Sequence, residues 1–261
     1  MFLKLILLLS LLLNLFLIRK ILFKTLRSKY FRSRIPTVSI SKVDKDFEFE
    51  KISEDLTVPK KVTLAKSMFF EEGNFKGITS DYEAWIMSVL AKKSKKIFEF
   101  GTCSGKTTYL LSENSPNDCE IFSITLSKNQ LNDLNHEFRD NEIAKKNAFE
   151  ESIYEKFFFT GKPSESKIRV IFQDSKKFNV SNFRRQFDLI FIDGGHTYSC
   201  IKNDSEKALE MIKENGLIFW HDYILYKKST SDVVKYLNEL STKYKICHIK
   251  RTQMCFLRYN K

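Results

Sequence analysis

Residues 96–108, with the sequence KIFEFGTCSGKTT, restrict the fold of this chain more than any other stretch. An apolar run that carries the acid Glu99 breaks into a loop with two glycines. This order predicts a buried strand, a tight turn and the start of a helix, the arrangement in which an open α/β sheet presents backbone N–H groups to a nucleotide-like ligand. Glycines between a strand and a helix are also an ordinary structural turn. The stretch therefore suggests a cofactor site, and residues elsewhere in the chain are needed to support that hypothesis.

Short apolar strands and helices alternate after this loop. We expect seven strands, at residues 96–100, 120–126, 168–172, 187–192, 216–220, 244–249 and 254–259. Helices are expected to begin at Thr79 or Ser80, Thr107, Ser127, Tyr198 and Ser231, with a further helix and loop over residues 141–166. This pattern predicts a doubly wound, Rossmann-like, mostly parallel sheet covered on both faces, and the last two strands predict an antiparallel C-terminal hairpin.

Residues 2–18 form a nearly uninterrupted apolar segment. As a helix it would be about 26 Å long, just enough for a thin bilayer. The basic cluster follows the apolar run, which by the positive-inside rule predicts a single-pass N-terminal membrane anchor with a cytoplasmic catalytic domain. A cleaved signal peptide is less favoured because no small-residue cleavage site follows, and a helix lying on the membrane surface is the other alternative.

The positive charge of the chain is concentrated at its start. The formal net charge is +12, and residues 1–34 hold eight Lys or Arg and no acid. A polybasic segment 19–34 beside an apolar one indicates a membrane surface as partner and argues against nucleic acid. We therefore divide the chain into an anchor with its basic segment at 1–34, a linker at 35–66 and a catalytic domain at 67–261.

The five cysteines are odd in number and show no paired spacing, so they suggest neither a disulfide framework nor a zinc site. Cys103 lies inside the glycine loop without a nearby histidine in the sequence. We interpret it as a small residue that fills the turn and not as a nucleophile.

The residues that follow each strand carry most of the candidate chemistry, because ligands of such sheets bind at the carboxyl ends of the strands. Three of the first five strand ends hold acids or histidines, a pattern that a purely structural sheet does not need. The polar residues at these ends are Thr102, Thr125, Asp174, Ser175, Asp193, His196, His221 and Asp222.

Four of these segments together resemble one enzyme family. They are EFGTCSG at 99–105, QDS at 173–175, FDLIFIDGGHTY at 187–198 and NGLIFWHDY at 215–223. In this order they are similar to class I S-adenosylmethionine-dependent methyltransferases, and most similar to methyltransferase family 24, a group that resembles metal-dependent O-methyltransferases. The resemblance covers roughly residues 75–260 and agrees with the seven-stranded sheet of that family.

The resemblance implies roles for individual residues. Glu99, Gly101, Thr102 and Gly105 would line the methionine end of the cofactor, with Asp174 and Ser175 near the adenine. Asp193, Asp222 and His221 would hold a divalent cation. The chain departs from the family at Thr125, where an acid usually bonds the ribose hydroxyls, because a threonine can make one such bond but supplies no charge.

The expected reaction is O-methylation of a small hydroxylated or sugar-like acceptor, with S-adenosylmethionine as donor and Mg²⁺ or another divalent cation in support. A hard cation on Asp193 and Asp222 would lower the pKa of the acceptor hydroxyl. His196 or His221 could serve as the base instead, and His221 could equally be a ligand or a merely hydrogen-bonded histidine. The alternatives from other classes are a nicotinamide-dependent Rossmann oxidoreductase and a non-catalytic, membrane-tethered binding module.

Overall fold

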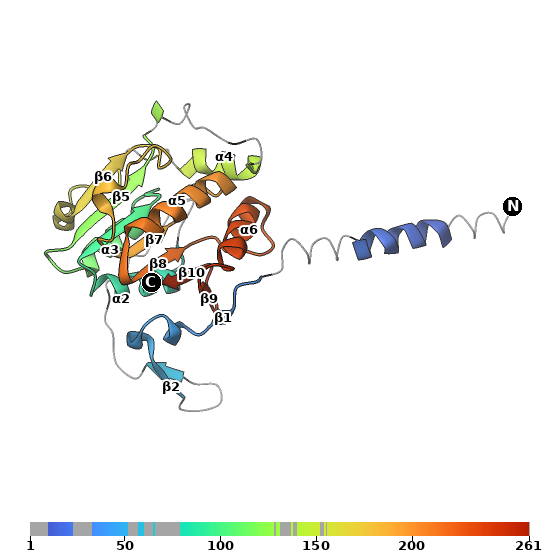
Figure 1. Cartoon of the computed structure of the whole chain (residues 1–261), viewed down its shortest axis with the longest axis horizontal. Helices are drawn as coiled ribbons and strands as arrows, with labels where there is room; N and C mark the ends of the chain where they lie inside the picture. Colours follow the sequence, from blue (N-terminus) through green and yellow to red (C-terminus); the bar gives the residue numbers. More distant parts are fainter. Residues whose placement is uncertain are drawn as a thin grey trace.

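The structure is a computed structural model of the whole chain (Figure 1). It describes residues 10–22, 33–51, 57–59, 65, 79–127, 129–130, 137, 140–151, 154 and 156–260. The helix predicted over residues 127–140 lies largely outside these ranges.

The domain is built on one sheet of eight strands in the order β1-β9-β10-β8-β7-β4-β5-β6. These strands are β1 (Thr37–Val38), β4 (Lys96–Phe100), β5 (Glu120–Thr125), β6 (Ile168–Phe172), β7 (Phe187–Ile192), β8 (Ile212–Trp220), β9 (Cys247–Ile249) and β10 (Cys255–Arg258). The strands β2 (Phe49–Lys51) and β3 (Thr57–Pro59) pair with each other in a separate antiparallel sheet.

All pairs in the large sheet are parallel except those of β10, which runs antiparallel to β8 and to β9. The mostly parallel sheet and the C-terminal hairpin are therefore confirmed. The sheet has eight strands instead of the seven expected, because β1 adds to its edge beside β9.

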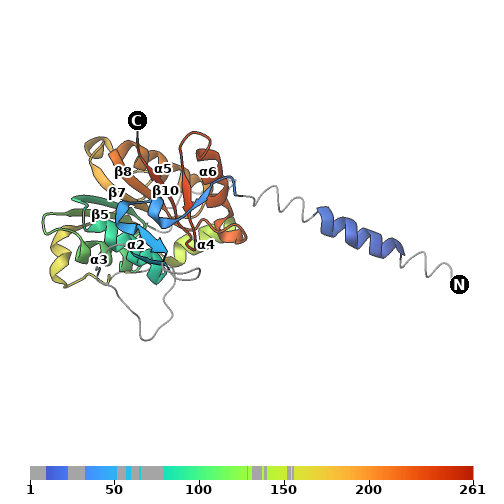
Figure 2. The same ribbon diagram turned by 90° about the horizontal axis from the view of Figure 1, so that it is seen from below.

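Two layers of helices enclose the sheet, as Figure 2 shows. The helices are α2 (Asp81–Ala91), α3 (Lys106–Asn114), α4 (Glu142–Glu151), α5 (Tyr198–Met211) and α6 (Ser231–Leu240). Short 3-10 turns lie at Ile40–Lys42, Lys45–Phe47, Pro163–Lys167, Ser181–Phe183 and Lys228–Thr230. Buried side chains of α2 and α3 pack on one face, and those of α5 and α6 pack on the other.

Neighbouring residues of the central strand β4 face these two different layers. Ile97 packs in the cluster with α2 and α3, whereas Phe98 packs in the cluster with α5 and α6, and neither is exposed. Burying such a side chain contributes about 1.5–3 kcal/mol. β4 therefore lacks a solvent-exposed face, which is typical of strands that appear in the sequence as largely apolar runs.

The segment before the domain is more ordered than the predicted linker at 35–66. Its described part forms β1, and Ile35, Ile40, Val43 and Phe47 are all buried. The amide of His248 also donates to the carbonyl of Pro36 at 2.9 Å. This part of the chain belongs to the packed domain.

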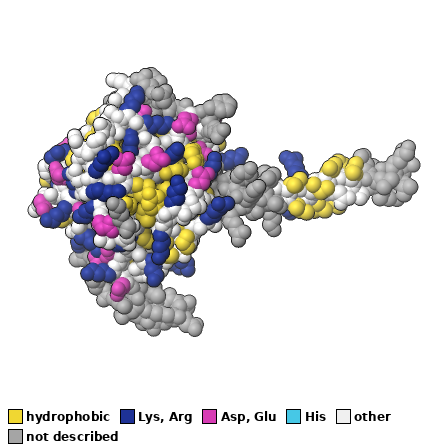
Figure 3. Space-filling view, viewed as in Figure 1, with side chains coloured by type: hydrophobic (Ala, Val, Ile, Leu, Met, Phe, Trp, Pro, Cys, Tyr) yellow, Lys and Arg dark blue, Asp and Glu magenta, His cyan; other side chains and the backbone are white. Residues whose placement is uncertain are grey.

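The N-terminal apolar segment is described only over residues 10–22, which form a helix. Its large apolar side chains are exposed, with Phe16 at 63% and Ile21 at 63% (Figure 3). Among the described residues no helix has the length and apolar character needed to cross a membrane. Residues 2–9 of the predicted anchor lie outside the described part of the chain.

Candidate active site

The strand order reverses direction at β4. From β4 the chain passes outward to β5 and β6, and then returns to β7 on the other side of β4. Ligands of open α/β sheets bind in the crevice that such a switch point leaves beyond the carboxyl ends of the strands. The candidate site is therefore the edge where the glycine loop after β4 meets the loops after β7 and β8.

Gly101 allows the loops after β4 and β7 to approach each other. It has φ of +95°, and an added Cβ would lie 2.2 Å from the carbonyl oxygen of Asp193. The amide of Asp193 donates to the carbonyl of Phe100 at 2.8 Å, which extends the pairing of the two strands. Only glycine fits this contact, and it places Asp193 directly beside the glycine loop.

Glu99 lies inside the sheet, where hydroxyl groups surround it. Its Oε2 accepts hydrogen bonds from Ser123 at 2.6 Å and from Thr108, and Thr102 Oγ1 lies 2.6 Å from Ser123 Oγ. Burial raises the pKa of Glu99 to about 8, although the bonds from Ser123 and Thr108 act in the opposite direction. Two of the predicted cofactor residues, Glu99 and Thr102, are thus joined in one buried network.

Gly105 is the residue that precedes α3, with φ of +80°. An added Cβ would lie 2.9 Å from side-chain atoms of Phe157 and of Phe159. The amide of Phe158 also donates to the carbonyl of Ser104 at 3.1 Å. The aromatic loop at 157–159 therefore packs directly on the glycine loop.

The remaining predicted cofactor residues follow β5 and β6. Thr125 is half-buried, and its carbonyl accepts from the amide of Gln173 at 2.9 Å. Asp174 is also half-buried, and its carboxylate accepts from the amide of Lys176 at 2.9 Å. Asn203 Nδ2 lies 3.4 Å from Ser175 Oγ. Thr125, Asp174 and Ser175 all lie at the ligand edge of the sheet, and Ser175 faces α5.

The loop after β7 is fixed by caps at the start of α5. Thr197 Oγ1 accepts from the amide of Cys200 at 3.3 Å, and a carboxylate oxygen of Asp140 accepts from the amide of Ser199 at 3.0 Å. Asp232 accepts in the same way from the amide of Tyr198 at 3.0 Å. These bonds satisfy the first N–H groups of the helix and hold the preceding loop in place.

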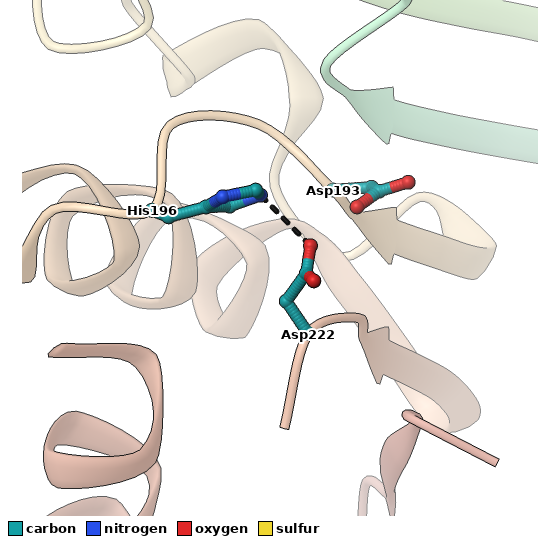
Figure 4. A group of neighbouring side chains, drawn as sticks. All are labelled: Asp193, His196 and Asp222. Atoms are coloured by element: carbon teal, nitrogen blue, oxygen red, sulfur yellow. Dashed lines mark ion pairs between the residues drawn. The ribbon is translucent and has the colours of Figure 1, made fainter. Parts of the chain in front are cut away.

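Asp193, His196 and Asp222 converge at this edge (Figure 4). Each offers one ligand atom, and these atoms lie within 4.8 Å of one another. His196 Nε2 lies 2.8 Å from Asp222 Oδ2, and both residues are buried, whereas Asp193 is half-buried. Two carboxylates and one imidazole form a donor set that fits a divalent cation.

His221 lies beside this group and not in it. Its Nδ1 lies 3.1 Å from Asp193 Oδ1, and its Nε2 lies 3.4 Å from Glu83 Oε2. Carboxylates thus contact both ring nitrogens of His221. The structure brings together two of the three predicted metal ligands, Asp193 and Asp222, with His196 in the third position instead of His221.

Glu83 belongs to the site although the sequence analysis did not select it. It is 1% exposed, and its Oε1 accepts from the amide of Gln253 at 2.6 Å. Together with Ser80 it forms the capping box that begins α2. The sequence SDYE at 80–83 signals this cap, but only the fold shows that the same carboxylate reaches His221.

Asp222 adopts a backbone conformation that few residues other than glycine tolerate, with φ of +60°. Such a conformation costs of order 1–3 kcal/mol and persists only where the surroundings enforce it. The ion pair to His196 and the contact of Asp222 Oδ2 with His221 Nδ1 at 3.3 Å supply that enforcement.

Residues 98–223 match the family model described as a methyltransferase domain. No curated protein sequence matches the chain significantly.

Several solved structures share the fold. A Staphylococcus aureus protein assigned provisionally as a caffeoyl-CoA O-methyltransferase is 15% identical, with 70% of this chain and 85% of that chain covered and a TM-score of 0.50. A Corynebacterium glutamicum protein is 9% identical, with 70% and 83% covered and a TM-score of 0.50. An O-methyltransferase from Bacillus cereus, in complex with SAH, is 13% identical, with 70% and 84% covered and a TM-score of 0.47. The two structures with a TM-score of 0.50 establish the fold.

Proposed function

Residues 98–223 of this chain belong to the class I S-adenosylmethionine-dependent methyltransferases, and we propose that they transfer the methyl group to a hydroxyl oxygen of a small acceptor. The observation that carries this proposal is the convergence of Asp193, His196 and Asp222 beside the glycine loop. A domain that only bound the cofactor would not need three buried or half-buried ionisable groups at that point.

The residues at the ligand edge fit S-adenosylmethionine. Asp174 carries a carboxylate that can accept from an amino or hydroxyl group, and Thr125 offers one hydroxyl without charge. Gly101 and Gly105 let the glycine loop pack closely against the backbone of Asp193 and against the side chains of Phe157 and Phe159, at the end of β4. We therefore assign the cofactor to this edge, with a ribose contact at Thr125 that is weaker than an acid would give.

We also propose a divalent cation on Asp193, His196 and Asp222. The carboxylate oxygens suit Mg²⁺ and Mn²⁺, and the imidazole nitrogen favours Mn²⁺ over an all-oxygen Mg²⁺ site. When bound, such a cation lowers the pKa of an acceptor hydroxyl and orients it. We infer that His221 positions Asp193 and does not bind the cation, because it contacts Asp193 but is not one of the three proposed ligand residues.

The proton of the acceptor hydroxyl passes to Asp193 in this proposal. Asp193 is the least buried of the three residues, because it is half-buried whereas His196 and Asp222 are buried. The new O–CH₃ bond forms as the S–CH₃ bond of the sulfonium breaks, and the thioether leaves as S-adenosylhomocysteine. The protein contributes mainly position and proton acceptance to this in-line displacement.

The test is transfer of a labelled methyl group from S-adenosylmethionine to hydroxylated small molecules and sugars, with and without a chelator. We expect transfer that the chelator abolishes and Mn²⁺ or Mg²⁺ restores. Titration with NAD in parallel tests the oxidoreductase alternative, and tight NAD binding without S-adenosylmethionine binding would overturn the assignment. Cofactor binding with no transfer to any acceptor would support the binding-module alternative instead.

We further propose that the N-terminal segment associates with the cytoplasmic face of a membrane. The helix at 10–22 exposes nine large apolar side chains, and its Arg19 and Lys20 begin the basic segment. Apolar burial and attraction to anionic lipids together favour a helix that lies in the interface. Flotation of the full chain with phospholipid vesicles tests this, and a chain that lacks residues 1–22 should remain with the soluble fraction.

A further inference from the structure

A cavity lies outside the candidate active site. Its volume is about 560 Å³, within the range of pockets that hold small ligands. Residues of β9, β10 and the segment after α6 line it. Lining residues 243–245 precede β9, and Tyr259 and Asn260 follow β10, which is antiparallel to β8, whereas the active-site residues follow the carboxyl ends of β7 and β8. The cavity therefore opens at the opposite edge of the sheet.

Positive charge surrounds this cavity. Lys42, Lys243, Lys245 and Arg258 line it, and no acidic side chain is among its described lining residues. Arg258 already contacts the carbonyl of Val43 at 2.7 Å and Asp44 at 3.5 Å. The three lysines are exposed, and within the described part of the chain none of them forms an ion pair.

The interior of the cavity is apolar and aromatic. Phe256 and Leu257 are 6% and 4% exposed, and Tyr244 and Tyr259 stand beside them, half-buried. Cys247 is a free thiol in the same lining. In the view of Figure 3, apolar side chains gather in the middle of the face near β10, with Lys and Arg around them. An apolar interior with a cationic rim matches a ligand that has an anionic head and an apolar body.

The N-terminal segment enters the domain next to this cavity. Val38 of β1 is a lining residue, and at most about 14 Å of chain separates it from Arg34. The amide of Arg34 donates to Asn238 Oδ1 at 3.0 Å, which fixes that point on α6. A membrane that binds the segment before residue 34 would therefore bring lipid headgroups within reach of the lysines.

We propose that this cavity binds an anionic phospholipid, with the phosphate on Lys243, Lys245 and Lys42 and the glycerol-acyl part against Phe256. The site would hold the domain on a membrane in one orientation, with the active-site edge turned away from the cavity. This inference rests on the membrane association proposed above, and its test separates the two.

The first experiment measures binding of the full chain to phosphatidylcholine vesicles with and without phosphatidylglycerol. The variant K243A/K245A is compared with K162A/K177A, which removes the same charge from exposed lysines outside the cavity. We expect the control to bind anionic vesicles like the wild type and K243A/K245A to bind about 30-fold more weakly. Equal binding by the two variants would overturn the proposal.

The second experiment reports on the cavity itself. Alkylation of Cys247, followed by peptide mass spectrometry, should slow when short-chain phosphatidylglycerol is added below its micelle concentration, and inorganic phosphate alone should protect less. Protection without any vesicle binding supports the cavity and contradicts the membrane association. Vesicle binding with no protection of Cys247 overturns the cavity and leaves the membrane association standing.

Discussion

His221 Nε2 lies 3.4 Å from Glu83 Oε2, so the first turn of α2 reaches into the acids and histidines at the end of the sheet. Burial would raise the pKa of Glu83, but the bond and charge of His221 lower it to about 2. Burial opposes charge on His221 too, yet Asp193 and its neighbours raise its pKa well above the usual value. Both partners are therefore charged at neutral pH.

Replacing Glu83 by Gln should keep the cap of α2 and remove the charge that faces His221. We expect the free energy of unfolding to fall by about 3 kcal/mol at neutral pH, because a buried imidazolium loses a partner. Glu83 has a lowered pKa, so its contribution is present above its ordinary pKa and lost as pH falls toward about 2. His221 has a raised pKa, so its contribution is lost at high pH instead.

Denaturant unfolding of E83Q and the wild type across pH measures this difference. The control is S80A, which removes the other half of the capping box and leaves the carboxylate on His221. It should cost about 1 kcal/mol and depend on pH less than E83Q does, because Ser80 Oγ donates to Glu83 at 2.6 Å but the charge pair with His221 remains. An E83Q loss that stayed constant down to pH 2 would show that Glu83 acts only as a cap.

Asp193→Asn should weaken both cation binding and methyl transfer. The change keeps the size of the side chain but removes one charged ligand and the proposed proton acceptor, and we expect transfer to fall by about 10²–10⁴-fold. Mn²⁺ binding, followed by calorimetry without cofactor, should weaken in parallel. Asp118→Asn, at a side chain that is 68% exposed, is the matched control and should alter neither quantity.

Glu99→Gln should make stability less dependent on pH. Burial raises the pKa of Glu99 to about 8, so the folded chain keeps a proton that the unfolded chain releases above about pH 4.5. Wild-type stability should therefore decrease from pH 5 to pH 8, by on the order of 4 kcal/mol from this group. Thermal unfolding of E99Q should lack that decrease. The exposed Glu142→Gln serves as control, and a parallel pH profile for E99Q and wild type would contradict the buried, protonated state.

Gly101→Ala should destabilise the domain by more than about 3 kcal/mol and displace Asp193. The added Cβ would meet the backbone of Asp193 at 2.2 Å, where no side-chain rotation relieves it. Gly161→Ala is the matched control, because Gly161 also has positive φ, at +76°, but nothing lies within 4 Å of the added atom. It should cost about 1 kcal/mol. Equal losses in the two variants would mean that backbone strain alone explains Gly101.

The strands of the sheet were the most predictable part of the fold, because strands buried on both faces are continuous apolar runs. The two-residue strand β1 carries no such run, and only its pairing with β9 makes it a strand. β8 begins at Ile212. Lys213 and Glu214 are exposed, and in the sequence they fit the end of the preceding helix equally well. Tertiary pairing overrides local pattern at both places.

The site was predictable where it follows strands, and less so where helices contribute. Asp193 and Asp222 stand directly after β7 and β8, so topology alone brings them together. The choice between His196 and His221 as third member depends on packing, because carboxylates contact both ring nitrogens of His221, whereas His196 meets Asp222 through Nε2. Glu83 is separated from His221 by 138 residues, and its local role as a cap gives no sign of the distant one.

The two edges of the sheet differ in what they offer to another chain. β1 ends one edge with two residues, whereas β6 ends the other with five and pairs only with β5 among the described strands. Arg169 stands on β6 with a 66% exposed side chain, 3.0 Å from Glu120. An exposed edge strand is a template for intermolecular β-pairing, and a charged side chain on it disfavours that pairing. Arg169 is such a charged side chain, and its replacement by valine would remove a charge that disfavours pairing of β6 with another chain.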